Sequence, residues 1–290
     1  MGILSRTESY FTEHSVDSPR LTAEILLAHS LDLRRLDLYL QHDRPLHQNE
    51  LSDYKALIRR RIQKEPVAYI TGEKGFFESD FEVARNVLIP RPETEILVEE
   101  ALKILNHDPS DSRNKKVLEL GAGSGAIIVT LAKAEPRHWY MANDISLPAL
   151  EIAKKNACRI AGNRIDFFAG DWFSSIKSRP GFDLVVSNPP YIPSADIRNL
   201  APEIRKYEPW IALDGGEDGL LCFRTILKDA HRHLIPGGIL LFEMGFDQRE
   251  SMENLVKLNP EYESIEVIKD LSGHDRVAKI KKSIDNNEQV

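Results

Sequence analysis

Four consecutive residues bring together the groups that could hold a planar nitrogen: Asn188, Pro189, Pro190 and Tyr191. The two prolines fix two φ angles and lack backbone N–H donors, so they offer only carbonyl oxygens. A carboxamide, a row of carbonyl acceptors and a flat ring suit an –NH2 group that donates two hydrogen bonds and stacks on the aromatic face. The tetrapeptide therefore predicts a slot for a planar amine or amide. The structural alternative is a proline turn that only closes a strand.

The position of the tetrapeptide favours the functional interpretation. It directly follows the apolar run 182–187, which is typical of a buried strand. Open α/β sheets bind their ligands outside the carboxyl ends of their strands, and Asn188 is the first residue beyond this one. We therefore expect Asn188 and its neighbours to lie at a ligand site.

A glycine-rich turn between a strand and a helix forms the second candidate site. The strand-like run 117–120 comes before this turn, and the apolar helical run 127–134 follows it. Glycines at such a turn permit unusual φ angles and let a ligand approach the backbone closely. The residues predicted to bind a cofactor here are Gly121, Ala122, Gly123, Ser124 and Gly125.

An acidic residue roughly 20 positions after the glycines completes the pattern. Asp144 comes just after the predicted second strand, 138–142, where a carboxylate typically binds the two hydroxyls of a ribose. The pattern indicates an adenosine-containing cofactor but does not separate a nicotinamide cofactor from S-adenosyl-L-methionine. The tetrapeptide separates them, because methyl transfer to a planar nitrogen uses such a slot and hydride transfer does not.

Strands and helices alternate from residue 116 onward and position both candidate sites. The predicted strands are residues 117–120, 138–142, 165–168, 182–187, 238–243, 264–268 and 276–280. The last two strands are predicted to form an antiparallel hairpin through Ser272 and Gly273, added to a sheet that is otherwise parallel. We therefore predict an α/β fold, a seven-stranded class I methyltransferase domain of the Rossmann-like type.

The amino-terminal part of the chain, up to about Gly72, shows helical periodicity and no strand pattern. We predict a small helical bundle there, followed by a β-hairpin or extended linker over 65–77. The dense basic run Arg59-Arg60-Arg61 is interpreted as a solvated helix end. A contact with an acidic or RNA-bound partner is the alternative.

Composition limits the classes of protein to be considered. The chain of 290 residues has a net charge of -7 and a pI of about 5.8, which argues against a protein that grips long nucleic acid through many phosphates. Cys158 and Cys222 lie in apolar helical contexts and are expected to be buried and reduced, and no Cys/His cluster has the spacing of a metal site. No apolar stretch approaches the roughly 20 residues of a membrane span, and the first residues lack the apolar core of a signal peptide. The sequence predicts a cytoplasmic monomer without a metal.

Further segments form a pattern together with the two candidate sites. The most specific are the proline-rich stretch 89–95, Glu208-Pro209 and the double-glycine loop 212–220. The other positions are Glu65, Pro66, Tyr69, Ile70, Gly72, Ile192, Pro193, Tyr207, Asp270, Leu271, Gly273, Asp275 and Arg276. With these residues the sequence resembles the release-factor glutamine N5-methyltransferases, the PrmC/HemK family, over nearly the whole chain. The tetrapeptide by itself is less specific, because DNA adenine methyltransferases share it.

The resemblance implies methyl transfer from S-adenosyl-L-methionine, leaving S-adenosyl-L-homocysteine, to the side-chain amide nitrogen of a glutamine. That glutamine belongs to the Gly-Gly-Gln motif of class 1 peptide-chain release factors, which are the implied protein partners; no nucleic acid or membrane partner is expected. The implied cofactor-binding residues are Gly121, Ala122, Gly123, Ser124, Gly125, Asp144, Trp172 and Asn188. The implied substrate-binding residues are Asn188, Pro189, Pro190 and Tyr191, of which Asn188, Pro189 and Tyr191 are catalytic.

The resemblance also suggests how the chain is divided. It implies a helical substrate-recognition domain over 1–72, a hairpin or linker over 73–90, and a methyltransferase domain over 91–290. Two other functions are weighed against this one. An adenine-N6 methyltransferase of DNA or RNA shares the slot, but it requires base flipping and a basic strand-binding surface. A non-catalytic adaptor that binds the release factor or the cofactor is disfavoured because the whole slot is present.

Overall fold

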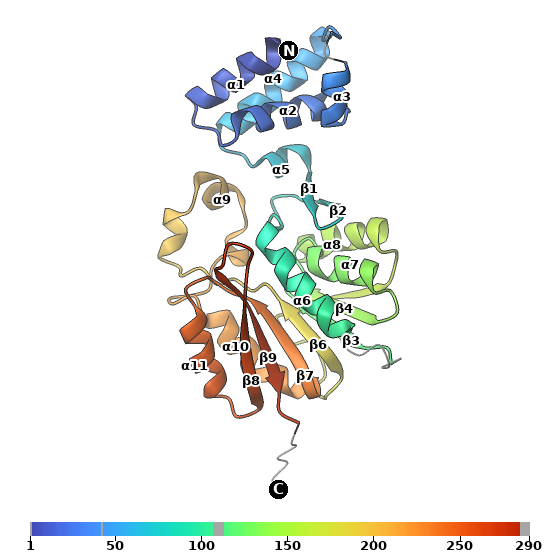
Figure 1. The fold of residues 1–290 in the computed structure, drawn as a ribbon, viewed down its shortest axis with the longest axis vertical. Helices are drawn as coiled ribbons and strands as arrows, with labels where there is room; N and C mark the ends of the chain where they lie inside the picture. The colour runs from blue at the N-terminus through green and yellow to red at the C-terminus, as the bar shows by residue number, and fades with distance from the viewer. Residues whose placement is uncertain (1, 42, 107–112, 285–290) are drawn as a thin grey trace. The chain divides into compact units, whose positions relative to one another are not determined.

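The computed structural model describes residues 2–41, 43–106 and 113–284 (Figure 1). The chain forms two compact units, which we call the helical unit and the α/β unit. The helical unit comprises residues 1–73 and 201–207, and the α/β unit comprises residues 74–200 and 208–290. The domain boundaries at residues 72 and 90 stay a prediction, and they do not anticipate that residues 201–207 group with the helical unit.

The described part of the helical unit contains six helices, and all but the last, α9, contribute to one hydrophobic cluster. They are α1 (Gly2–Glu13), α2 (Pro19–Ser30), α3 (Arg35–Leu40), α4 (Gln48–Ile62), α5 (Val67–Thr71) and α9 (Pro202–Tyr207). Phe11, Leu26 and Tyr54 are fully buried in this cluster. The prediction of extended structure is wrong at α5, because Pro66 stands at its N-cap and Gly72, with a φ of 81°, ends it.

The basic run on α4 is mostly engaged inside the helical unit. Arg61 is only 4% exposed, and its Nη2 lies 2.6 Å from a carboxylate oxygen of Glu203 on α9. Arg60 donates to both carboxylate oxygens of Glu65, at 2.8 and 3.0 Å. The prediction of a solvated helix end is therefore wrong for Arg61, because a buried guanidinium requires a charged partner and α9 supplies it.

The α/β unit is built on a seven-stranded sheet of order β5-β4-β3-β6-β7-β9-β8. Its strands are β3 (Lys116–Leu120), β4 (Trp139–Asp144), β5 (Ile165–Ala169), β6 (Phe182–Ser187), β7 (Leu234–Glu243), β8 (Tyr262–Lys269) and β9 (Asp275–Lys282). The first five run parallel, while β9 is antiparallel to both β7 and β8. The predicted class I methyltransferase sheet and its final hairpin are confirmed.

Helices cover both faces of this sheet (Figure 1). Helices α6 (Glu95–Leu105), α7 (Ala126–Ala134) and α8 (Leu147–Ile160) pack with one hydrophobic cluster, and α10 (Leu221–His233) and α11 (Arg249–Lys257) pack with the other. A hairpin of β1 (Glu73–Phe76) and β2 (Ser79–Glu82) adds Phe76 and Phe81 to the first cluster. The expectation that both cysteines are buried is right for Cys222 and wrong for Cys158, which is exposed on α8.

Candidate active site

The carboxyl edge of the parallel strands supplies the residues that could do chemistry. Leu120 of β3 pairs with Asn143 of β4 and with Ser187 of β6, and Ser187 pairs in turn with Phe242 of β7. Because these strands are parallel, the next residue of each one reaches the same carboxyl edge. The order of the strands reverses between β3 and β6, which is where open α/β sheets bind their ligands. The residues at this edge are Gly121, Asp144, Asn188 and Glu243.

A cavity of about 490 Å³ opens at this edge and is lined by residues of the α/β unit alone. Its volume is in the ordinary range for small-molecule sites. Of the predicted site residues, it brings together Gly121, Ala122, Gly123, Ser124, Asp144, Trp172, Asn188 and Pro190. Within the described chain, Gly125, Pro189 and Tyr191 are not part of its lining. Gly125 is instead the N-cap of α7 and packs on α8, where an added Cβ would lie 3.2 Å from the Cβ of Ala153.

The acid at the end of β4 holds the glycine loop in place. The Gly123 amide donates to Asp144 Oδ2 at 2.8 Å, and the Ser146 amide donates to Oδ1 at 2.8 Å. Gly121 and Gly123 have φ angles of 75° and 54°, in a region that favours glycine. Burial raises the pKa of Asp144, and its backbone hydrogen bonds partly oppose that increase. The loop therefore presents bare backbone beside a half-buried carboxyl group.

Trp172 borders the same loop. Its backbone carbonyl accepts a hydrogen bond from Asn143 Nδ2 at 2.5 Å. Its indole Cζ3 lies 3.7 Å from the point where a Cβ would stand on Gly121. A half-buried indole next to a glycine loop offers a flat surface on which a planar heterocycle can stack.

Side chains from two other segments anchor the tetrapeptide after β6. Asn188 Nδ2 donates to Thr94 Oγ1, just before α6, at 3.3 Å. The Tyr191 hydroxyl donates to Glu243 Oε1, at the end of β7, at 3.2 Å. Burial and the nearby Glu243 carboxyl raise the pKa of Tyr191. Its ring packs against the hydrophobic cluster beneath α10 and α11.

The double-glycine loop supports the backbone that leaves the tetrapeptide. The Gly215 amide donates to the Ile192 carbonyl at 2.8 Å, and the Ile192 amide donates to the Leu213 carbonyl at 3.1 Å. A Cβ added to Gly219 would lie only 2.4 Å from the Tyr191 carbonyl oxygen. Glycine is therefore required where this loop meets the tetrapeptide.

The sequence reasoning missed a buried acid on the first strand of the site. Glu119 lines the cavity, is 1% exposed, and accepts a hydrogen bond from the Ile128 amide at 3.1 Å. Burial raises its pKa well above the usual range, and the Asp144 charge adds to the effect. The only sequence signal that could have identified Glu119 was its position on the strand, two residues before Gly121.

Three more residues were missed because their partners are distant in the sequence. Glu208 accepts from the Ile89 amide at 3.1 Å and pairs with Arg91 at 2.5 Å. These partners lie 119 and 117 residues away from it, so no local pattern connects them. Thr94 and Glu243 were likewise not recognised as the partners of the tetrapeptide.

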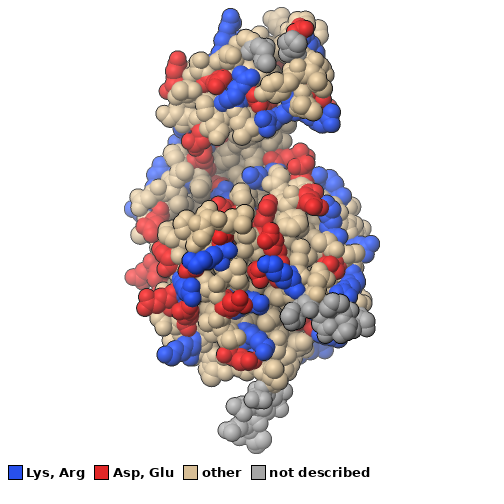
Figure 2. Space-filling view, viewed as in Figure 1, with Lys and Arg blue, Asp and Glu red and all other residues tan. Residues whose placement is uncertain are grey.

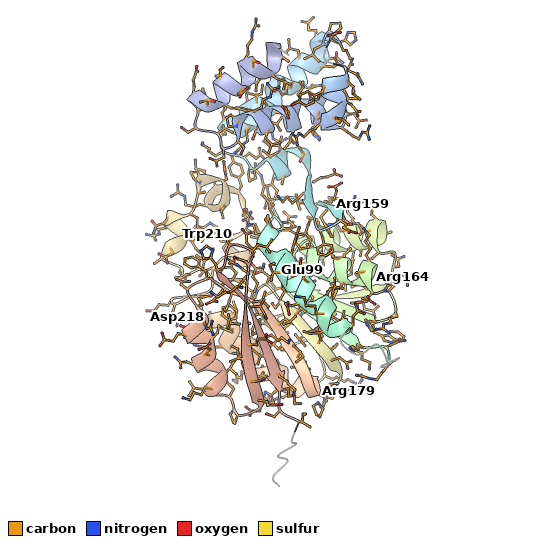
Figure 3. The ribbon with its side chains drawn as sticks, in the orientation of Figure 1. Glu99, Arg159, Arg164, Arg179, Trp210 and Asp218 are labelled. Carbon is orange, nitrogen blue, oxygen red and sulfur yellow. The ribbon has the colours of Figure 1, made fainter. Side chains whose placement is uncertain are left out.

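Exposed apolar side chains form part of the cavity lining. Trp210 and Ile211, at the start of the short helix η3 (Trp210–Ala212), are 51% and 61% exposed. Figure 3 labels Trp210. Large apolar side chains that line a cavity and still reach solvent are typical of sites that contact a second molecule.

The described residues give little indication of other kinds of site. They contain no group of three or more His, Cys, Asp and Glu side chains that could hold a metal ion. None of the helices described has the length and apolar character needed to cross a membrane. Figure 2 shows acidic and basic side chains interspersed over the viewed face of the α/β unit.

Two family models match the chain. The PrmC N-terminal domain matches residues 3–72, and the methyltransferase small domain matches residues 94–204. Among curated proteins, the chain is 43% identical over 250 residues to the release factor glutamine methyltransferase of Geobacter sulfurreducens, covering 86% of this chain and 85% of that protein. It is 41% identical over 279 residues to the protein of that name from Chlorobaculum tepidum, covering 94% of each chain.

Solved structures of other methyltransferases share the fold. The hMettl16 catalytic domain, solved in complex with an RNA hairpin, has a TM-score of 0.57 at 12% identity and covers 71% of this chain and 76% of that one. The delta-N METTL16 methyltransferase domain has a TM-score of 0.53 at 14% identity, covering 71% and 88%. At these identities the likeness concerns the fold alone.

Proposed function

The chain belongs to the release factor glutamine methyltransferase family, and we propose that it methylates the glutamine of the Gly-Gly-Gln motif in class 1 peptide-chain release factors. The methyl donor is S-adenosyl-L-methionine, and the acceptor is the side-chain amide nitrogen, N5. We expect the enzyme to act as a monomer in the cytoplasm, where release factors work.

The proposal rests mainly on one observation: the glycine loop and Asn188 start at the same carboxyl edge of the sheet, from neighbouring strands. Leu120 and Ser187 are paired neighbours, so the glycine loop and Asn188 begin side by side. Both then line one cavity. A methyl donor on the glycine loop and a planar amide beside Asn188 would therefore meet within one site.

The residues present fit the proposed cofactor. The loop supplies exposed backbone, Asp144 can accept hydrogen bonds from ribose hydroxyls, and Trp172 can stack against the adenine. Asn188 lines the same cavity as the glycine loop and is the first residue of the proposed amine slot. When bound, the cofactor supplies an electrophilic methyl group on a positively charged sulfur.

In the proposed mechanism, the tetrapeptide positions a weak nucleophile. The lone pair of an amide nitrogen is delocalised into its carbonyl, so positioning is the main contribution that the protein can make. The Asn188 carboxamide oxygen and the Pro189 carbonyl each accept one N–H of the substrate glutamine, and Tyr191 stacks on its amide plane. These fixed acceptors stabilise the positive charge that develops on the nitrogen. After transfer the methylated nitrogen is strongly acidic and loses one proton to solvent water.

The test is labelled methyl transfer to a purified class 1 release factor. We expect methylation of the intact release factor and none when the glutamine of its Gly-Gly-Gln motif is replaced by alanine. Duplex DNA and single-stranded RNA, assayed in parallel, should accept no methyl group. Methylation of adenine in either nucleic acid would contradict the proposal. Equal labelling of the intact release factor and of its glutamine-to-alanine variant would also contradict it.

The exposed apolar lining leads to a second prediction. Trp210→Ala should raise KM for the release factor by about tenfold, because an exposed aromatic side chain at a binding site often contributes more than 1 kcal/mol. The affinity for S-adenosyl-L-homocysteine should change less than about twofold, since cofactor and protein substrate bind different parts of the cavity.

Trp139→Ala is the matched control for this prediction. Trp139 is 63% exposed and lies at the start of β4, whereas the cavity opens at the opposite, carboxyl edge of that strand. Its replacement should leave KM unchanged. Equal increases of KM in the two variants would assign the effect to general loss of an exposed tryptophan.

A further inference from the structure

The orientation of the Asn188 carboxamide is not determined by the tetrapeptide alone. A carboxamide has an acceptor end and a donor end, and the two are interchanged by a half turn. The proposed function requires the oxygen to face the substrate, since the substrate –NH2 can only donate there. A group elsewhere in the chain must therefore hold the donor end, and Thr94 does so in this structure.

Thr94 occupies a position where its hydroxyl would ordinarily serve a helix. It is the N-cap of α6, yet its side chain makes no capping hydrogen bond. Threonine at an N-cap usually accepts from the backbone of the first turn. Here the side chain is 4% exposed and lines the cavity, where Oγ1 accepts from Asn188 Nδ2. The hydroxyl is thus used by the site rather than by the helix.

Glu243, at the end of β7, lies next to both Tyr191 and Thr94. The carboxyl group is 1% exposed, and it accepts from the Tyr191 hydroxyl through Oε1. The Thr94 side chain also acts on it as a hydrogen-bonding group, although Oε2 has no partner of good geometry among the described residues. Burial raises the pKa of Glu243, and the Thr94 and Tyr191 hydroxyls and the Arg276 charge oppose that increase.

A buried carboxyl group is costly for folding unless it is fully hydrogen-bonded. An apolar side chain would fill the end of β7 at less cost. The hydrogen bond that Glu243 accepts from the Tyr191 hydroxyl gives this carboxyl group a role in the site.

We propose that Thr94 and Glu243 are positioning residues that fix the Asn188 carboxamide with its oxygen toward the substrate. In this arrangement Glu243, which accepts from the Tyr191 hydroxyl, also takes the hydroxyl proton of Thr94, so that Thr94 Oγ1 presents its lone pairs to Asn188 Nδ2. The Asn188 oxygen is then left to accept from the substrate glutamine. This inference rests on the proposed function and extends it to two residues outside the tetrapeptide.

The position of Thr94 is itself stabilised by charged contacts. Glu208 binds the Ile89 amide and the Arg91 side chain, which fixes the proline-rich stretch just before Thr94. Pro92 then begins the 3-10 turn η1 (Pro92–Thr94), which leads directly into α6. A rigid approach of this kind is what a positioning residue requires.

The test compares Thr94→Val, which keeps the shape and removes the hydroxyl, with Thr94→Ser, which keeps the hydroxyl. The valine variant should lose about 100-fold in kcat for release-factor methylation, the size of effect that misplacement of a reacting group produces. KM and the affinity for S-adenosyl-L-homocysteine should stay near the wild-type values. The serine variant should retain most of the activity.

Two further variants complete the test. Glu243→Gln replaces one acceptor oxygen by an –NH2 group, so one hydroxyl loses its acceptor and kcat should fall by about tenfold or more. Thr130→Val removes another buried hydroxyl, which donates to the Ala126 carbonyl at 2.7 Å within α7, and it should leave kcat unchanged.

Normal kcat in Thr94→Val, or equal losses in Thr94→Val and Thr94→Ser, would overturn the inference. So would a fall in cofactor affinity that matches the fall in kcat. If the valine variant does not fold, Glu243→Gln decides: reduced kcat with normal cofactor affinity supports the inference, and normal kcat overturns it.

A failure of the proposed function gives a different result, because the wild-type chain would then methylate no release factor. In that case crystal structures of wild type, Thr94→Val and Thr94→Ser decide the inference. It predicts that the Asn188 side chain is reoriented in the valine variant alone. An unchanged Asn188 in the valine variant overturns it.

Discussion

Replacement of Asn188 by alanine should lower kcat for release-factor methylation by about 1000-fold, comparable to the loss of one pre-organised group that stabilises a transition state. The change removes an acceptor from the substrate nitrogen at the point where positive charge develops. The fold should persist, because Asn188 is only half-buried and lies beyond the end of β6. The measurement is kcat in a labelled methyl-transfer assay, with denaturant unfolding to confirm that stability is retained.

Two other substitutions define what the alanine result means. Asn188→Asp keeps an acceptor oxygen but cannot donate to Thr94, and it should retain more activity than the alanine variant. Asn259→Ala removes an amide whose Nδ2 donates to the Leu255 carbonyl at 2.8 Å at the end of α11. It should leave kcat unchanged. Turnover near the wild-type rate in Asn188→Ala would refute the proposed role of the tetrapeptide.

Gly219→Ala should destabilise the α/β unit and reduce methylation together. A φ of 74° costs an alanine about 1 kcal/mol. The added Cβ would also lie 2.4 Å from the Tyr191 carbonyl oxygen and 2.8 Å from Gln248 Nε2, and such overpacking costs about 2 kcal/mol more. Relief of this overlap displaces Tyr191 and so disturbs the substrate slot. All three tryptophans belong to the α/β unit, so the denaturation midpoint can be followed by their fluorescence.

Gly273→Ala separates the two causes. Its φ is 84°, and an added Cβ would meet no atom within 4 Å. It should therefore show only the conformational cost of about 1 kcal/mol and normal kcat. Equal losses of stability and of kcat in the two variants would mean that the contact between residue 219 and Tyr191 contributes nothing.

The α/β unit was largely predictable because its signals are local. Most of the parallel strands contain a short apolar run, and a turn or a polar segment marks the end of each. The helical unit was predictable in type but less so in detail. Residues 67–71 form a helix of only five residues, too short for helical periodicity to identify. Arg61 appeared to be solvated because its partner, Glu203, lies 142 residues later.

The candidate site was predictable where one segment carries all of its chemistry. The glycine loop, Asp144 and Asn188 each follow a strand, so their convergence follows from the topology. The roles of Thr94, Glu208 and Glu243 could not be predicted, because each depends on a side chain from another segment. A threonine before a helix indicates a cap in any sequence, and only the three-dimensional contacts show that its hydroxyl is used differently.

The grouping of α9 with the helical unit has a practical consequence for dividing the chain. The helical unit is discontinuous in sequence, since residues 201–207 belong with residues 1–73. A fragment beginning at residue 74 would retain Glu203 but lack Arg61, its buried partner. Residues 201–207 would then have no helical unit to pack against. The exposed segment would be prone to proteolysis and aggregation. Deletion of residues 1–73 therefore leaves part of the helical unit behind. An isolated catalytic fragment should also have residues 201–207 replaced by a short polar linker.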